Sequence, residues 1–399
     1  MGEVRIGIIG LGAVGGAVAA RLLASRLEGE RFGLAAGSAG SAERIRAQGF
    51  VVQSGRGEER ARLRVTRTGP RGATDEAQAA PRGPEERRDG LHDRLEAEQD
   101  LIDAALPAFP DGGLYSLILL CTRAEGTDAA LAQALPLLDP TGAIACLQNG
   151  LPEARVAARA GAARTLGAVI GWSATSTSPG AIAITGQGGF LLGAAGDTGA
   201  SSGAGVRAAH PHERLQAAAR LLSRAFPTRM TDNLAGARWS KLALNCAISS
   251  LGAVSGLSFG ELARSRDGRA LALAIIAEVA SVAAAKGVRL SRISGLDPRW
   301  LADAGDARLS SRLARPLRDA LFWLASRQRP RQRSGMLERL LAGRTSGQIE
   351  DLNGAVLVEA RALGVAVPLN ERVVGLVHAI ERGEARIGVA NLRELRGSG

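Results

Sequence analysis

A glycine-rich turn near the N-terminus constrains the fold more than any other feature of this sequence. The run Gly10-Leu11-Gly12-Ala13-Val14-Gly15 has the spacing G-x-G-x-x-G, and it stands between an apolar stretch at 4–9 and a helical pattern at 13–27. A buried strand that turns directly into a helix is the opening unit of a Rossmann domain. The first glycine permits the tight turn, the second lets the backbone approach a pyrophosphate, and the third lets helix and strand pack closely. The sequence therefore predicts that residues 10–15 bind a dinucleotide; the alternative is a glycine-rich turn of some other α/β protein.

Strand and helix patterns alternate through the rest of the N-terminal half. Short apolar runs predict buried strands at 32–36, 114–121 and 143–147, and a helix is expected at 128–138. This alternation is typical of a parallel, doubly wound sheet. Further β-like segments between 165 and 193 are split by Gly and Pro, and we expect the sheet to end there.

The C-terminal half has a helical pattern almost throughout. Because 399 residues exceed one typical domain, we expect two. The predicted fold class is α/β, with an N-terminal Rossmann doubly wound parallel sheet over residues 1–229, followed by an all-helical C-terminal domain over residues 230–399. A polar stretch at 56–99 is interpreted as an irregular insertion without a chemical role. Apolar spacing of three to four residues predicts helices at 237–254, 268–286, 311–326, 336–343, 348–363 and 370–382.

The second predicted strand ends in residues that favour one form of the cofactor. Sites that prefer NAD(H) usually carry Asp or Glu there to hold the ribose hydroxyls. The run Leu34-Ala35-Ala36-Gly37-Ser38 offers no acid, and Arg44 and Arg46 follow it. Guanidinium groups attract a 2′-phosphate, so the sequence favours NADP(H) over NAD(H). The alternative is that both arginines are solvated residues on a helix surface.

Charge and hydropathy restrict the partners and the compartment. The net charge of +11 could attract a polyanion such as nucleic acid. The excess positive charge is nearly all Arg, however, and includes loop stretches at 56–71 and 327–333, so we expect no nucleic-acid partner. The N-terminus has no signal pattern, and the longest later apolar stretch, 271–285, is interrupted by Glu278. We expect a cytoplasmic protein that is not bound to a membrane.

The three cysteines predict neither a metal site nor a disulfide framework. Cys121, Cys146 and Cys246 lack metal-ligand spacing and lie in apolar runs, as buried reduced thiols do.

Four further stretches carry a resemblance to a known family. Cys121-Thr122-Arg123-Ala124 follows a predicted strand, and Leu147-Gln148-Asn149-Gly150 follows the next one. Trp239-Ser240-Lys241-Leu242-Ala243-Leu244-Asn245-Cys246 has the spacing W-x-K-x-x-x-N, and Asp351-Leu352-Asn353-Gly354 stands ahead of Gly364-Val365-Ala366-Val367-Pro368. Together with the glycine turn, these motifs resemble the ketopantoate (2-dehydropantoate) reductase family over most of the chain. The resemblance implies a Rossmann domain followed by a helical domain.

The resemblance also implies hydride transfer from a nicotinamide to a 2-oxo acid, which yields a 2-hydroxy acid. Reduction of a ketone develops negative charge on its oxygen, so an acid is needed beside it, and Lys241 on a largely apolar helix is the candidate. Asn245 lies one turn further along the helix, where its amide could bind substrate. Asn149 and Arg123 follow strands, where ligands of open α/β sheets bind, and they are assigned to the cofactor. A solvated helix lysine at 241 and a turn-forming Asn149 are the alternatives.

Several residues depart from the family pattern. Gln348 stands where the family carries a Glu, and a glutamine can bind a substrate hydroxyl but cannot titrate. Ser249 and Phe259 replace two residues that are often Asn, and Arg123 replaces a Lys. Ser249 and Gln348 are kept as candidate substrate contacts.

Three functions therefore remain open. Ketopantoate is the leading substrate, which would yield pantoate and place the protein in pantothenate biosynthesis. A bulkier or more apolar 2-oxo or 2-hydroxy acid is the second possibility, and a non-catalytic NADP-binding module is the third. A homodimer would be compatible with any of them.

Overall fold

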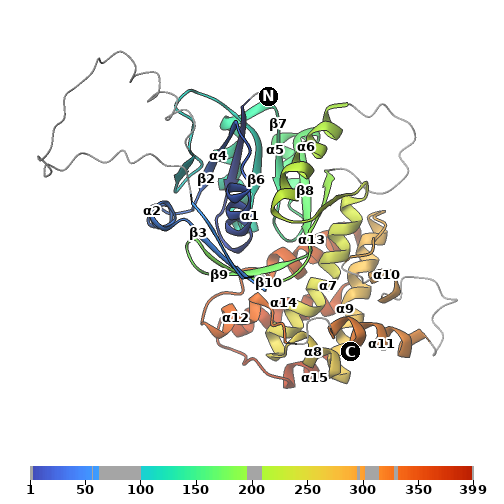
Figure 1. Cartoon of the computed structure of the whole chain (residues 1–399). Coiled ribbons are helices and arrows are strands. Elements are labelled where there is room, and N and C mark those ends of the chain that lie inside the picture. Colours follow the sequence, from blue (N-terminus) through green and yellow to red (C-terminus); the bar gives the residue numbers. More distant parts are fainter. Residues whose placement is uncertain are drawn as a thin grey trace, which may run out of the picture.

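The computed structural model describes residues 3–55, 57–62, 100–195, 209–293, 297–301, 314–327 and 331–397. The N-terminal part is built on an eight-stranded sheet, and the C-terminal part is a group of helices (Figure 1).

The large sheet has the order β12-β11-β8-β7-β6-β1-β2-β5. Neighbours pair in parallel except at β8 and β11, where the pairing is antiparallel. The strands are β1 (Val4–Ile9), β2 (Glu30–Ala35), β5 (Leu101–Asp103), β6 (Tyr115–Leu120), β7 (Leu138–Cys146), β8 (Thr165–Ile170), β11 (Phe190–Ala194) and β12 (Thr228–Met230).

Helices cover both faces of this sheet. One face packs on α1 (Ala13–Ala24) and α6 (Ala209–Ala225), and the other packs on α4 (Thr127–Ala134) and α5 (Glu153–Ala160). The alternation of side chains along β1 explains this arrangement, because Ile6 and Ile8 lie in the first core and Ile9 lies in the second. The predicted doubly wound Rossmann sheet is confirmed.

A second sheet of four strands was not predicted. Its order is β4-β3-β10-β9, made of β3 (Phe50–Ser54), β4 (Gly57–Ala61), β9 (Ser173–Ser178) and β10 (Ala181–Gly186). The expectation that the large sheet ends within 165–193 is therefore wrong: β8 and β11 of that stretch belong to it, β9 and β10 do not, and β12 follows as a further strand. The expectation of an irregular insertion from residue 56 is also wrong at its start, because β4 pairs with β3. Three of the five residues of β4 are charged and exposed, so its sequence has no apolar alternation. Residues 63–99 lie outside the described part of the chain.

The C-terminal part is helical over its described residues, as predicted. Its members are α7 (Leu234–Ser255), α8 (Phe259–Arg264), α9 (Arg266–Ala285), α10 (Pro298–Leu301), α11 (Ala314–Ser326), α12 (Gly335–Leu341), a π-helical turn η5 (Glu350–Gly354), α13 (Ala355–Leu363), α14 (Pro368–Glu381) and α15 (Ala390–Gly397). The predicted division after residue 229 falls inside β12 and stays a prediction.

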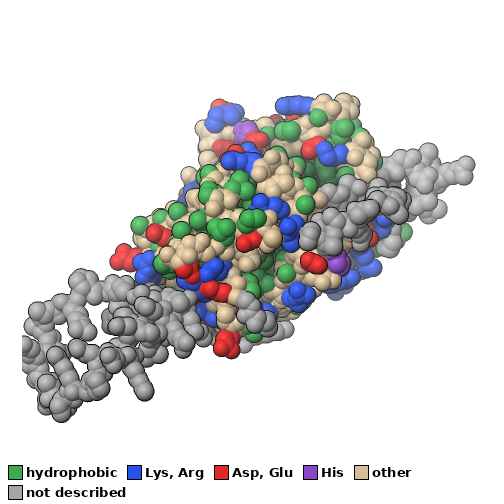
Figure 2. Space-filling model, turned by 90° about the horizontal axis from the view of Figure 1, so that it is seen from above, with side chains coloured by type: hydrophobic (Ala, Val, Ile, Leu, Met, Phe, Trp, Pro, Cys, Tyr) green, Lys and Arg blue, Asp and Glu red, His purple; other side chains and the backbone are tan. Residues whose placement is uncertain are grey.

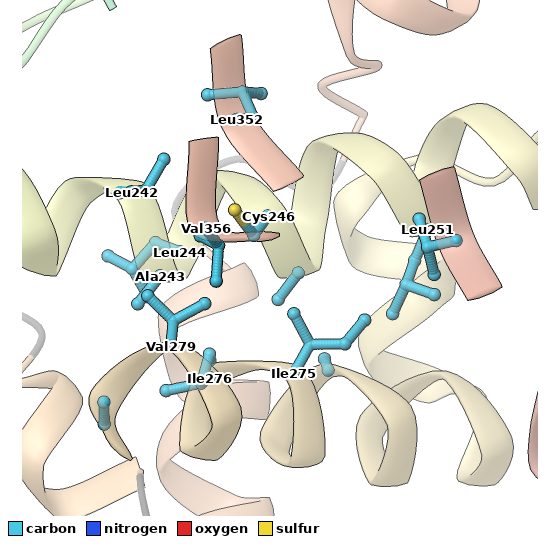
Figure 3. Close-up of a cluster of buried hydrophobic side chains, with 14 of the residues drawn as sticks. Leu242, Ala243, Leu244, Cys246, Leu251, Ile275, Ile276, Val279, Leu352 and Val356 are labelled. Carbon is cyan, nitrogen blue, oxygen red and sulfur yellow. The ribbon is translucent and has the colours of Figure 1, made fainter. Parts of the chain in front are cut away.

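Helix α7 is the centre of this part. The Asn233 side chain accepts a hydrogen bond from the Gly236 amide at its start, and Gly256 ends it in a left-handed conformation. Figure 3 shows α7 packed along α9, with Cys246, Ile275 and Val279 in one buried cluster. Packing in this core therefore holds α7 in place, together with the side chains on its other faces.

Helix α9 is long and apolar enough to cross a membrane by length and composition alone, the one such helix among the described residues. Half of its most apolar window is buried in the protein, and its Glu278 carboxylate accepts hydrogen bonds from the Leu369 and Asn370 amides. Packing in the helical core accounts for its hydropathy.

The burial predicted for the cysteines holds for two of the three. Cys146 and Cys246 are buried, as predicted, and burial raises the pKa of both thiols, whereas Cys121 is only half-buried.

On the face shown in Figure 2, basic side chains are scattered among acidic and hydrophobic ones.

Candidate active site

In the glycine turn between β1 and α1, two of the three motif glycines leave no room for a side chain, and the third leaves room for one. Gly10 has φ +95°, and a Cβ there would lie 2.8 Å from the Thr122 amide nitrogen. A Cβ on Gly15 would lie 2.0 Å from the Gly10 carbonyl oxygen. A Cβ on Gly12, by contrast, would meet no atom within 4 Å. The fold itself thus requires Gly10 and Gly15, while the space beside Gly12 is open to a ligand.

This open space lies where an α/β sheet binds ligands. Strand β1 lies between β2 and β6, so connections leave it on both sides, and the crevice at such a point is the usual ligand site. Gly12 is also the N-cap of α1, and no side chain caps that helix end. Exposed amides at a helix N-terminus attract a phosphate, so the residues present fit the pyrophosphate of a dinucleotide.

A cavity of about 550 Å³ adjoins the turn and is lined by both parts of the chain. Eight residues singled out from the sequence line it: Ala13, Val14, Asn149, Lys241, Asn245, Ser249, Phe259 and Gln348. Gly10, Leu11, Gly12, Gly15 and Arg123 do not line it.

Lys241 and Asn149 meet in this cavity. Lys241 is presented by α7, and Asn149 lies in the turn after β7. The Lys241 ammonium donates a hydrogen bond of 2.9 Å to Asn149 Oδ1. Asn245 lies one helical turn beyond Lys241 and lines the same cavity. Two motifs about 90 residues apart in the sequence therefore form one polar centre.

Gln148 holds the Asn149 turn in place, a role that the sequence did not reveal. Its side chain is buried, and its amide nitrogen donates to the hydroxyl groups of Thr122 at 3.0 Å and Thr127 at 2.9 Å. These bonds join the ends of β6 and β7. Asn149 is thereby fixed relative to the glycine turn, against which Thr122 packs.

Arg238 fastens α7 to the same turn and was also missed. It is buried, forms an ion pair with Glu153 (Nε to Oε1 2.8 Å) and donates to the main-chain oxygens of Gln148 and Cys146. Since Arg238 precedes Lys241 by three residues on α7, these bonds hold the Lys241 segment of the helix beside the turn that carries Asn149. A charged residue within an apolar helix was the sequence signal that could have revealed this role. Its partner Glu153 is 85 residues away, so the sequence could not show the ion pair.

Arg238→Ala is expected to lower the free energy of unfolding by about 3 to 5 kcal/mol, because it leaves the mostly buried Glu153 carboxylate without its partner. Urea unfolding measures the change. Arg382→Ala, which removes an exposed ion pair with Glu384, is the matched control and should change stability little. A loss for Arg238→Ala no larger than that of the control would show that the pair does not anchor α7.

The turn after Asn149 touches the helical part directly. Gly150 has φ +77°, and a Cβ there would lie 2.6 Å from the Asp351 main-chain oxygen. Burial, aided by the nearby Glu125 carboxylate, raises the pKa of Asp351 to about 6. Only glycine fits this contact between η5 and the turn, which explains why Asn149 is followed by glycine.

The charge of the cavity is positive. Among the described residues that line it, Lys241 and Arg333 carry charge, and no carboxylate is present. Gln348 lines the cavity at the position where the family pattern carries an acid. Trp172, Gln332, Arg333 and Ser334 also line it and were not predicted from the sequence. Such a lining suits an anionic ligand.

The arginines assigned to the cofactor differ in their surroundings. Arg46 donates a hydrogen bond of 2.6 Å to the Ile102 carbonyl, whereas Arg44 is exposed on α2 (Ala39–Gln48). A guanidinium nitrogen of Arg123 lies 3.3 Å from where a Cβ of Gly347 would be, beside the Arg339 guanidinium. Desolvation, with the charges of Arg123 and Arg344, lowers the pKa of Arg339.

Comparison with known proteins decides the family. The sequence matches the family Ketopantoate reductase PanE/ApbA over residues 6–197 and the C-terminal region of the same family over residues 233–381. The chain belongs to the ketopantoate reductase family. Its members are oxidoreductases that act on a CH–OH or ketone group.

The curated relatives of the family are distant. A 2-dehydropantoate 2-reductase of Pyrobaculum aerophilum is 29% identical over 153 residues, which is 38% of this chain and 46% of that protein, so the match spans less than half of it. A 2-dehydropantoate 2-reductase of Pyrococcus horikoshii is 23% identical over 271 residues, 68% of this chain and 77% of that protein.

Solved structures share the whole fold. A ketopantoate reductase of the family from Ralstonia eutropha superposes with a TM-score of 0.64 at 21% identity, covering 96% of this chain and 99% of that one. D-mandelate dehydrogenase, solved with NADH and anilino(oxo)acetate, superposes with a TM-score of 0.68 at 19% identity, covering 95% and 99%. The Rossmann and helical parts of the present chain thus have the arrangement of this family.

Proposed function

We propose that this protein reduces a 2-oxo acid to a 2-hydroxy acid with NADPH. One observation carries the proposal: the Lys241 ammonium is held by Asn149 in a cavity that Ala13 and Val14 of the glycine turn also line. A proton donor and a dinucleotide-binding turn therefore face the same space. The relatives named as 2-dehydropantoate 2-reductases support the same reaction class.

The glycine turn would hold the cofactor. Gly12 leaves room for the pyrophosphate, and the first amides of α1 point to it. When bound, the nicotinamide supplies the hydride that reduces the ketone.

Lys241 would donate the proton that the reduced oxygen requires. Its hydrogen bond to Asn149 orients the ammonium, and the anchor of Arg238 on Glu153 restricts the movement of α7. Asn245 and Ser249, at positions four residues apart on α7, would bind the substrate together with Gln348. The absence of any carboxylate from the described lining lets the acid group of the substrate enter without repulsion.

A binding module that has lost turnover is the second candidate, favoured by Gln348 in place of an acid. The two candidates differ in one measurement. Both bind NADPH, but the enzyme consumes it when ketopantoate or another 2-oxo acid is added, whereas the module never does.

NADPH is expected to bind more tightly than NADH, because β2 ends without a carboxylate and the exposed Arg44 follows on α2. Arg44→Gln should weaken NADPH binding roughly tenfold, in line with about 1.5 kcal/mol for a charge-assisted hydrogen bond. NADH binding should not change, which makes it the internal control. Fluorescence titrations of both forms at equal ionic strength measure this. Tighter binding of NADH by the wild-type protein would contradict the assignment.

A further inference from the structure

Polar and apolar residues both line the cavity. The polar residues include the Lys241–Asn149 centre with Asn245, Ser249 and Gln348. Six apolar residues come from the helical part, from α7, α8, α11 and the segments next to them: Ile248, Leu257, Phe259, Ile293, Leu321 and Leu324. These six residues are called the apolar wall below.

The apolar wall is continuous with the core but not covered by it. Ile293 is buried, and Ile248, Leu257, Phe259 and Leu321 are only partly buried while they pack against the same core cluster. Leu324 is 56% exposed. Apolar side chains that contact a core on one side and a cavity on the other lose contact with water only when a ligand covers them.

The wall is also rigidly supported. The Phe259 ring packs edge-on against the buried Phe322 ring of α11, with 5.6 Å between centroids. The Phe259 amide donates a hydrogen bond of 2.9 Å to the Gln332 carbonyl, which holds the segment that carries Arg333 against the start of α8. The shape of the wall is therefore set before any ligand arrives.

From this lining we infer that the substrate of the proposed reaction is a 2-oxo acid with a large apolar side chain, of the size of an isobutyl or benzyl group. The inference rests on the proposed function and names its substrate class. The oxo and acid groups contact the Lys241–Asn149 centre, and the side chain covers the apolar wall. A small side chain would leave the apolar wall in contact with water. A hydroxylated side chain would place its hydroxyl against the side chains of Phe259 and Leu321, which offer it no hydrogen-bond partner.

The test compares kcat/KM of the wild-type protein, with saturating NADPH, for four acids: pyruvate, ketopantoate, 4-methyl-2-oxopentanoate and phenylpyruvate. The two bulky apolar acids should exceed pyruvate by at least about tenfold and up to roughly 100-fold, the gain expected from burying one large apolar side chain. They should also exceed ketopantoate.

Variants of the wall make the test specific. Leu321→Ala and Phe259→Asn should each reduce the preference for phenylpyruvate over pyruvate, measured as the ratio of their kcat/KM values, several-fold or more. Leu317→Ala is the matched control, since Leu317 lies on the same helix α11, is 62% exposed and does not line the cavity. It should leave the preference unchanged.

The outcomes separate this inference from the proposed function. Reduction of ketopantoate or pyruvate at a rate equal to or above that of the bulky acids would overturn the inference and leave the reductase function standing. Preference for the bulky acids that survives both wall variants would also overturn the inference, because the wall would not be its cause. Failure to reduce any 2-oxo acid would overturn both.

Discussion

Replacement of Lys241 by alanine is expected to lower turnover by roughly 10² to 10⁴, the usual range for loss of a general acid. Its ammonium is hydrogen-bonded to Asn149 and lines the cavity, and the only other charged residue of the described lining is Arg333. In the sequence, His92, His210, His212 and His378 lie outside every motif that resembles the family, and Gln348 has no proton of suitable acidity. We therefore propose Lys241 as the proton donor to a substrate oxygen in this cavity.

The sequence provides a matched control for this variant, since it contains two lysines. Lys286 lies at the end of α9, away from the cavity lining, and forms a partly exposed ion pair with Glu359. Lys286→Ala should keep full turnover, and NADPH affinity should change little in either variant. Near-full turnover of Lys241→Ala would identify the lysine as a structural helix residue.

Gly12→Val is expected to abolish cofactor binding, with a loss of NADPH affinity of at least about 100-fold, or roughly 2.7 kcal/mol. The backbone at Gly12 has φ −72°, and a Cβ would meet no atom within 4 Å, so the variant should fold. The added side chain would occupy the space in which the pyrophosphate must approach the backbone.

A titration of NADPH fluorescence measures this loss, and thermal unfolding checks the fold. Gly375→Val is the control, because Gly375 lies on α14, where a Cβ would also meet no atom within 4 Å, and is remote from the glycine turn in the sequence. It should bind NADPH like the wild type. Unchanged NADPH affinity of Gly12→Val would remove the glycine turn from the cofactor site.

Local patterns were sufficient to predict the Rossmann sheet and most helices. The spacing of Gly10, Gly12 and Gly15 reflects constraints within about a dozen residues, and the structure shows the close contacts of Gly10 and Gly15 directly. The helix at 237–254 was expected because its apolar residues recur on the face that packs on α9. Its start at Leu234 was missed, since the capping residue Asn233 lies outside the apolar pattern.

Contacts between distant segments could not be predicted. Strand β4 is mostly charged and exists through its pairing with β3. The segment that forms β10 was assigned to the wrong sheet, because a sequence pattern does not specify a strand's neighbour. The roles of Gln148 and Arg238 depend on partners that lie elsewhere in the fold. The sequence placed Lys241 and Asn149 in separate motifs, and only the structure shows that they are hydrogen-bonded.

Isotope transfer tests most directly whether this protein passes a hydride to C2 of a 2-oxo acid. NADPH deuterated at both C4 positions is incubated with the wild-type protein and, in separate reactions, with phenylpyruvate and with ketopantoate, and the products are analysed by mass spectrometry. We expect a 2-hydroxy acid with one deuterium at C2, formed in equal amount to the NADP⁺. Deuterated NADPH that is bound but not consumed, or consumed without label in the acid, would contradict it.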